Sequence, residues 1–150
     1  MKQVFLDTDV IMDFLIMRQP FAVESMKLME YSNRNTLKLY ISSLSLSNIY
    51  YLISRIENKS KSREKIKGIL KLVETLSVHK STIEKAVYSE FKDFEDAIQN
   101  FCAKENGIKS IITRNTKDYS KSSLSIQTPK EFIIEFEKKY IIGQPTLHIS

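Results

Sequence analysis

Short apolar runs alternate with longer amphipathic stretches along most of the chain. In the longer stretches the apolar residues recur at helical spacing, for example at Leu46, Ile49, Tyr50 and Ile53. The expected strands are residues 4–6, 37–42, 76–80, 110–115 and 123–128. Strands that alternate with helices pair in parallel and are covered on both faces. The sequence therefore predicts an α/β fold, a three-layer sandwich around a central parallel sheet of four or five strands.

The ends of several helices can be assigned from capping residues and apolar positions. Asp9 is expected to begin the first helix, and the fourth helix is expected to extend to Val73. Ser81 is a candidate cap for the helix at residues 81–90, and Gly107 suits the end of the helix before the fourth strand.

Composition places the chain among ordinary globular proteins. It has 150 residues, of which 42% are hydrophobic and 27% charged, with only three Gly and three Pro. The single Cys102 cannot form an intramolecular disulfide and is expected to be a small core residue in a reducing compartment. The start, MKQVFLD, lacks an apolar signal-like segment, and no run is long enough to cross a membrane. A cytoplasmic location is therefore expected.

Acidic residues crowd the first motif, VFLDTDVIMD, which contains Asp7, Asp9 and Asp13. One interpretation is structural: Asp7 ends a strand, Asp9 caps a helix, and Asp13 lies on an exposed face one turn later. The other interpretation is a cation site. That interpretation requires carboxylates from elsewhere in the chain, because neighbouring carboxylates repel one another.

Such residues follow the other expected strands. Sites in open α/β sheets form outside the carboxyl ends of the strands. The residues expected near that edge are Asp7, Asn48, Asp93, Asp96, Asn115 and Asp118. Mg²⁺ and Mn²⁺ prefer oxygen ligands of this kind. The formal net charge of +5 places the excess Lys and Arg elsewhere, which suits a polyanionic substrate but is also common in proteins without one.

Three motifs in order resemble those of the PIN domain, a fold of metal-dependent ribonucleases. VFLDTDVIMDFL resembles the opening Asp-Thr-Asn-Val motif, DFEDAIQNFCA the central motif, and IITRNTKDY the closing motif. The resemblance covers residues 3 to about 138. It implies an endoribonuclease that hydrolyses RNA with Mg²⁺ or Mn²⁺, with Asp7 and Asp96 as metal-binding acids. A VapC-type toxin of a type II toxin–antitoxin pair is one such protein, and an antitoxin partner and a homodimer are then expected.

Two positions depart from the family pattern. Asn48 stands where the family commonly has Glu, and Asn115 stands where it commonly has Asp. An amide oxygen can still ligate or accept a hydrogen bond, but it carries no charge. The alternative function is therefore a catalytically weakened PIN-fold module that binds RNA or a protein.

The resemblance and the residues together give a set of candidate site residues. The candidate catalytic acids are Asp7, Asp96, Asp93 and Asp118, of which Asp7, Asp96 and Asp118 are also candidate metal ligands. The candidate lining residues are Asp9, Asn48, Thr113 and Asn115, and the candidate RNA-binding residues are Arg63, Lys67, Lys71 and Arg114. Structural alternatives remain open: Asp93 as a helix cap, Asp118 as a turn residue, and the row at 63, 67 and 71 as a solvated helix face.

A second enzyme class shares only the first motif. An apolar strand followed by Asp-x-Asp also resembles haloacid dehalogenase-like phosphatases, with Asp7 as nucleophile and Asp9 as general acid. That family needs a late acidic motif directly after an apolar strand, whereas DFED follows the polar SEFK. His79 and His148 are expected to be structural or solvated.

The chain shows no internal repeat and no linker. We expect one domain at residues 1–138 and a C-terminal tail at residues 139–150 that packs on the domain, pairs with a partner chain or stays loose.

Overall fold

A five-stranded parallel sheet forms the centre of the fold, as the sequence predicts. The structure is a computed structural model, and it describes residues 1–142. The strand order is β3-β2-β1-β4-β5. The strands are β1 (Lys2–Leu6), β2 (Leu37–Ser42), β3 (Val73–Leu76), β4 (Ser110–Ile112) and β5 (Ser125–Gln127).

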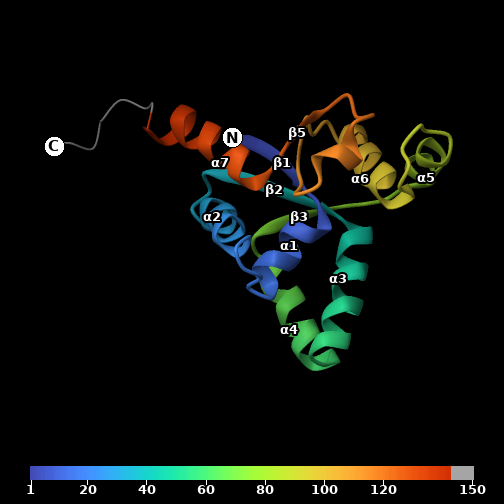
Figure 1. The fold of residues 1–150 in the computed structure, drawn as a ribbon. Coiled ribbons are helices and arrows are strands. Elements are labelled where there is room, and N and C mark those ends of the chain that lie inside the picture. The colour runs from blue at the N-terminus through green and yellow to red at the C-terminus, as the bar shows by residue number, and fades with distance from the viewer. Residues whose placement is uncertain (143–150) are drawn as a thin grey trace.

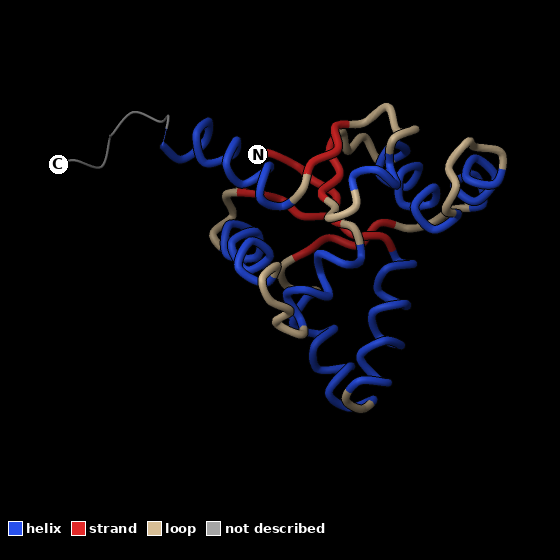
Figure 2. The backbone as a smooth tube through the Cα atoms, in the orientation of Figure 1, coloured by secondary structure: helices blue, strands red, loops and turns tan. Residues whose placement is uncertain are grey.

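Helices cover both faces of this sheet, which confirms the three-layer architecture (Figures 1 and 2). The helices are α1 (Thr8–Leu15), α2 (Ala22–Asn33), α3 (Ser43–Ile56), α4 (Lys59–Ile69), α5 (Lys80–Val87), α6 (Phe94–Glu105) and α7 (Pro129–Phe136). The 3₁₀ helix η1 (Thr116–Tyr119) follows β4, and the π-helical segment η2 (Glu137–Ile142) continues α7. Figure 1 shows α1 to α4 on one side of the sheet and α6 on the other. None of the described helices is both long and apolar enough to cross a bilayer.

Strand alternation explains the two apolar layers. Successive side chains of a strand point to opposite faces. Val4 and Leu6 therefore join the core under α1, α2, α3 and α7, where Ile41 of β2 and Ile53 of α3 are also fully buried. Phe5 points the other way and packs in the core beside α6 and η1. Both faces are buried, which is the condition that favours a parallel sheet.

The third strand lies earlier than the sequence analysis predicts. It spans Val73–Leu76 and not residues 76–80, so Val73 belongs to a strand and not to the fourth helix. A short apolar run fits a buried helix face or a buried strand equally well, and pairing with Leu39 of β2 decides in favour of the strand.

Two helix starts also differ from expectation. Asp7, not Asp9, is the N-cap of α1, and its side chain accepts a hydrogen bond from the Thr8 N–H. His79, not Ser81, is the N-cap of α5, where the Thr82 hydroxyl accepts from the His79 N–H. Gly107 has the positive φ of 72° expected just after a helix.

The order of the strands positions the candidate site. β1 is central, with β2 on one side and β4 on the other. The carboxyl ends of these strands therefore lie side by side, followed by α1, α3 and the loop into η1. The last described helical segment extends to Ile142, and the expected domain end at residue 138 stays a prediction. Residues 143–150, including His148, lie outside the described residues.

Candidate active site

The Asp7 carboxylate lies where β1 and β4 end together. The Asp7 N–H continues the pairing by donating to the Ile112 carbonyl at 3.0 Å. One carboxylate oxygen accepts from the Thr8 N–H at 2.8 Å, and the other accepts from the Thr113 hydroxyl at 2.8 Å. Burial raises the pKa of Asp7 even though these hydrogen bonds oppose the rise. The side chain is thus fixed in place and costly to ionise.

Two further acids are close enough to Asp7 to disfavour each other's charge. Burial and the neighbouring carboxylates, with Asp7 foremost, raise the pKa of Asp96 to about 7. Burial and the Asp7 carboxylate raise the pKa of Asp9 to about 6, against the opposing effect of Arg114. Asp118 adds to the repulsion on both Asp7 and Asp96. The acids from β1, α1, α6 and η1 therefore form one electrostatic cluster.

A hydrogen-bonded network beneath the acids ties three helices together. The Gln99 amide donates to the Ser45 hydroxyl at 2.5 Å and to the Thr8 hydroxyl at 3.2 Å. Its carbonyl oxygen accepts from the Ser42 hydroxyl at 2.5 Å. Gln99 lies one helical turn after Asp96, so the network sets the distance of α6 from α1 and α3. It offsets part of the repulsion between the acids of these elements.

The acids open onto a cavity of about 340 Å³. Its lining residues are Asp7, Thr8, Asp9, Met12, Arg18, Leu52, Ile56, Glu95, Asp96, Gln99 and Asn115. The cavity therefore has carboxylates, one guanidinium group and a set of apolar side chains on its surface.

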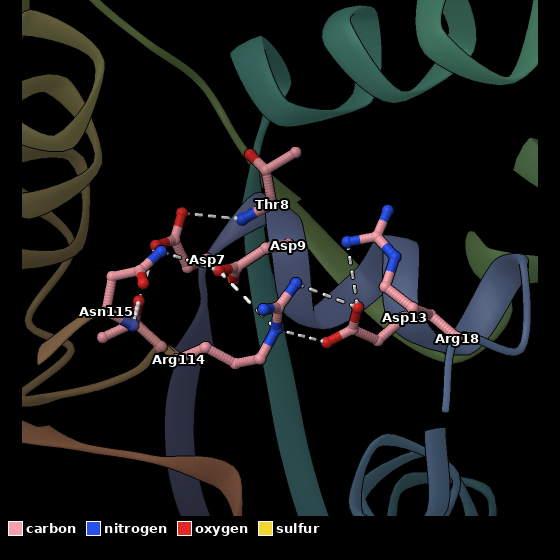
Figure 3. Close-up of polar contacts among 8 residues, drawn as sticks. Asp7, Thr8, Asp9, Asp13, Arg18, Arg114 and Asn115 are labelled. Carbon is pink, nitrogen blue, oxygen red and sulfur yellow. Dashed lines mark hydrogen bonds and ion pairs between the residues drawn. The ribbon is translucent and has the colours of Figure 1, made fainter. Parts of the chain in front are cut away.

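A buried carboxylate organises the adjoining part of the site (Figure 3). Asp13 is fully buried, and Arg114 donates to both of its oxygens, at 2.7 Å and 3.2 Å. Arg18 approaches Asp13 at 3.3 Å from the other side. The exposed-face interpretation of Asp13 is therefore wrong, because α1 turns this residue toward two arginines from other segments.

The structure brings five of the candidate residues together. Asp7, Asp96, Asp9 and Asn115 line the cavity, and Thr113 donates to Asp7. The Asn115 amide also donates to Asp9 at 3.2 Å. This amide thus provides a hydrogen-bond donor at the position where the family commonly has an acid.

The remaining acids flank the cavity. Asp93 is the N-cap of α6 and accepts from the Asp96 N–H at 2.9 Å, as its structural interpretation expects. Asp118 lies with Asp93 in a separate surface depression. Asn48 is half-buried on α3 one turn before Leu52 and does not itself line the described cavity.

The candidate RNA-binding residues lie in two places. Arg63, Lys67 and Lys71 are exposed on and after α4, and within the described residues none of them lines the cavity. The Arg114 guanidinium is engaged by Asp13 and stacks 4.1 Å from the centre of the Phe21 ring, which gives it a structural role.

Sequence reasoning missed Arg18, Gln99 and the burial of Asp13. Gln99 follows Asp96 by three positions on the same helix, and that spacing could have predicted that both side chains lie on one face of it. Arg18 carried no such signal, because it follows α1 in an irregular segment and reaches the site only through the fold.

The donor groups at the cavity fit a hard divalent cation. Asp7, Asp9 and Asp96 supply carboxylate oxygens, and one oxygen of Asp9 is buried without a hydrogen-bond partner among the described residues. Within residues 1–142, no three Asp, Glu, His or Cys side chains are close enough together to enclose an ion by themselves. Mg²⁺ does not need such an enclosure, since it retains several waters and binds one or two carboxylates plus substrate phosphate.

Without metal, the free energy of unfolding should decrease as the pH rises from about 4 to about 7. The raised pKa values of Asp96 and Asp9 mean that the folded chain binds more protons than the unfolded chain in this range. The stability that a raised carboxyl pKa contributes is fully present when the pH is below the pKa of that group in the unfolded chain. It is lost as the pH rises through the pKa of the group in the folded chain. Thermal melts in chelator should show this decline, and Asp96→Asn should make it shallower. An identical decline of stability with pH in the wild type and in Asp96→Asn would contradict the raised pKa of Asp96.

Breaking the buried ion pair should cost far more stability than removing its exposed partner. Arg114→Gln should reduce the free energy of unfolding by about 3 kcal/mol or more, because Asp13 is then left buried with a single long contact. Arg18→Gln should cost less than about 1 kcal/mol, because its side chain is 40% exposed and Arg114 still pairs with Asp13. Urea unfolding at neutral pH measures both values. Equal decreases in the free energy of unfolding for the two variants would show that Arg114 is not the main partner that stabilises the buried Asp13 carboxylate.

Known proteins with similar sequences and folds show the family of this chain. A family model described as PIN domain matches residues 3–117. Ribonuclease VapC1 of Aquifex aeolicus is 30% identical over 136 residues, which cover 87% of this chain and 93% of that protein. A toxin–antitoxin complex from Klebsiella pneumoniae shares the fold with a TM-score of 0.64 at 20% identity, over 84% of this chain and 97% of that chain. VapC20 of Mycobacterium tuberculosis, a sarcin–ricin loop cleaving toxin, does so with a TM-score of 0.58 at 16% identity, over 72% of this chain and 86% of that chain. The chain belongs to the PIN domain family.

Proposed function

We propose that this protein is a Mg²⁺- or Mn²⁺-dependent endoribonuclease that hydrolyses RNA phosphodiester bonds. The observation that carries the proposal is the convergence of Asp7 and Asp96 on one cavity, where their charges repel. Such an arrangement is unfavourable until a cation or protons neutralise it. The relation to Ribonuclease VapC1, which extends over most of both chains, supports RNA as the substrate.

Asp7 and Asp96 would hold the metal ion, with Asp9 beside them and Asp118 as a further acid nearby. When bound, a divalent ion lowers the pKa of water and offsets the charge that develops on the phosphate. The chain's own residues supply the positioning. Thr8 and Thr113 orient the Asp7 carboxylate, and Gln99 keeps α6, and with it Asp96, at a fixed distance from α1.

We further propose that the protein is the toxin of a type II toxin–antitoxin pair, in the cytoplasm and as a homodimer. The Klebsiella pneumoniae complex and VapC20 support the toxin assignment, because each shares most of its fold with this chain. The expected partner is then a small antitoxin protein. A reading frame for such a protein next to this gene is the simplest check of the partner.

A catalytically weakened RNA- or protein-binding module is the second candidate. It is favoured by Asn115, whose amide donates a hydrogen bond to Asp9 where the family commonly has an acid. Asn48, which stands where the family commonly has Glu, is likewise neutral. Such a module would bind RNA or a partner without site-specific binding of Mn²⁺.

Asp7→Asn and Asp96→Asn should each abolish Mn²⁺-dependent RNA cleavage while the fold is retained. Each change removes charge that the cation needs, and Asn is still a favoured N-cap at position 7. Cleavage of single-stranded RNA with and without Mn²⁺, paired with thermal melts, measures the effect. Glu84→Gln on α5, which removes a carboxylate far from the cavity, should leave cleavage unchanged. Cleavage by Asp96→Asn at the wild-type rate would contradict the proposed site.

A further inference from the structure

Arg18 presents a positive charge to the cavity that holds the acids. It follows α1, and its N–H donates to the Asp13 carbonyl at 3.0 Å, which anchors the backbone. Its guanidinium group lies 3.3 Å from the Asp13 carboxylate, and its side chain is 40% exposed. Arg18 lines the same cavity as Asp7 and Asp96.

The charge of Arg18 is left largely unneutralised by the fold. Two guanidinium groups share the single Asp13 carboxylate, and Arg114 makes the shorter, bidentate contact. Arg114 is also 4.0 Å from Asp9, stacks on Phe21 and is only 22% exposed. Arg114 is thus bound on several sides by the protein, whereas Arg18 has Asp13 as its one ion-pair partner among residues 1–142 (Figure 3) and lines the cavity.

The remaining lining of the cavity suits a nucleic-acid strand. The apolar side chains of Met12, Leu52 and Ile56 line it together with Arg18, and Leu52 and Ile56 are substantially exposed. A guanidinium group matches two phosphate oxygens in a bidentate geometry. A ribose or base beside that phosphate could then pack on the apolar residues.

We propose that Arg18 binds a backbone phosphate of the RNA strand in this cavity and is a substrate-binding residue. The inference rests on the proposed ribonuclease function and adds to it. Arg18, and not Arg114, is then the arginine that contacts RNA, because the Arg114 guanidinium is already paired with Asp13. Asp13 is then a positioning residue that holds the backbone and side chain of Arg18 toward the acids.

The test measures RNA binding and metal binding separately in the full chain. A labelled single-stranded RNA of mixed sequence is titrated in Mg²⁺ with Asp96→Asn, which prevents cleavage, alone and combined with Arg18→Gln, Arg18→Lys or Arg34→Gln. Arg34 is the matched control, because it is an exposed arginine paired with Glu30 at the end of α2. Mn²⁺ affinity is measured in the otherwise wild-type chain with and without Arg18→Gln.

Arg18→Gln should weaken RNA binding about tenfold and reduce the salt slope by about 0.7, the value for one phosphate contact on a single strand. Arg18→Lys should keep the salt slope of the parent protein, because lysine retains the positive charge, but it should lose part of the affinity, because an ammonium group cannot make the bidentate contact. Arg34→Gln should match the parent protein. In the otherwise wild-type chain, Arg18→Gln should leave Mn²⁺ affinity unchanged and raise KM more than it lowers kcat.

The outcomes separate this inference from the proposed function. If the wild type cleaves RNA and Arg18→Gln changes neither affinity nor salt slope, Arg18 does not bind RNA, while the ribonuclease proposal stands. If the wild type neither binds nor cleaves RNA, both proposals are wrong. If Arg18→Gln fails to fold, Arg18→Lys decides: a decrease of the salt slope as large as that expected for Gln, in a folded Lys variant, would overturn the charge argument.

Discussion

The packing of the Asp7 carboxylate between β1 and β4 is the constraint on which the rest of the site depends. Its N–H extends the pairing of the two strands by one residue, and its oxygens accept from Thr8 and Thr113. The same side chain therefore caps α1, fixes the end of β4 and directs a carboxylate toward the cavity. A one-residue shift in the register of β1 against β4 would remove Thr113 from Asp7 and turn the side chains of the shifted strand to the opposite face of the sheet.

The fold holds the acids together but leaves most of their repulsion in place. Gln99 links α6 to α1 and α3 through hydrogen bonds to hydroxyl groups. These groups are neutral, so they do not offset the negative charge of the acids. Arg114 brings a positive charge near Asp9 but is neutralised mainly by Asp13. The cluster consequently keeps raised pKa values, and a divalent cation can gain binding energy there by relieving the repulsion.

Periodicity and motif position predicted most of the architecture. Val4, Phe5 and Leu6 alternate between two cores, and acids at the ends of strands meet at the carboxyl edge, as the parallel arrangement requires. The third strand was misplaced because Ile66, Ile69, Leu70 and Val73 recur at helical spacing, which assigned Val73 to the fourth helix. The partners of Asp13 could not be predicted, because Arg114 is 101 positions away in the chain and only the pairing of β1 with β4 brings it near.

The central claim is that the carboxylates at this edge form a divalent-cation site, and proton release on metal binding tests it most directly. At about pH 6.5, Asp96 is largely protonated because its pKa is about 7, so binding of Mn²⁺ to its carboxylate must displace a proton. Calorimetric titrations with Mn²⁺ in two buffers of different ionisation enthalpy measure the number of protons released. We expect a buffer-dependent heat in the wild type that becomes smaller in Asp96→Asn, where Asp7 and Asp9, whose pKa values are also raised, still release protons. Saturable binding with the same heat in both buffers, or binding that is unaffected by Asp96→Asn, would show that the cation binds elsewhere.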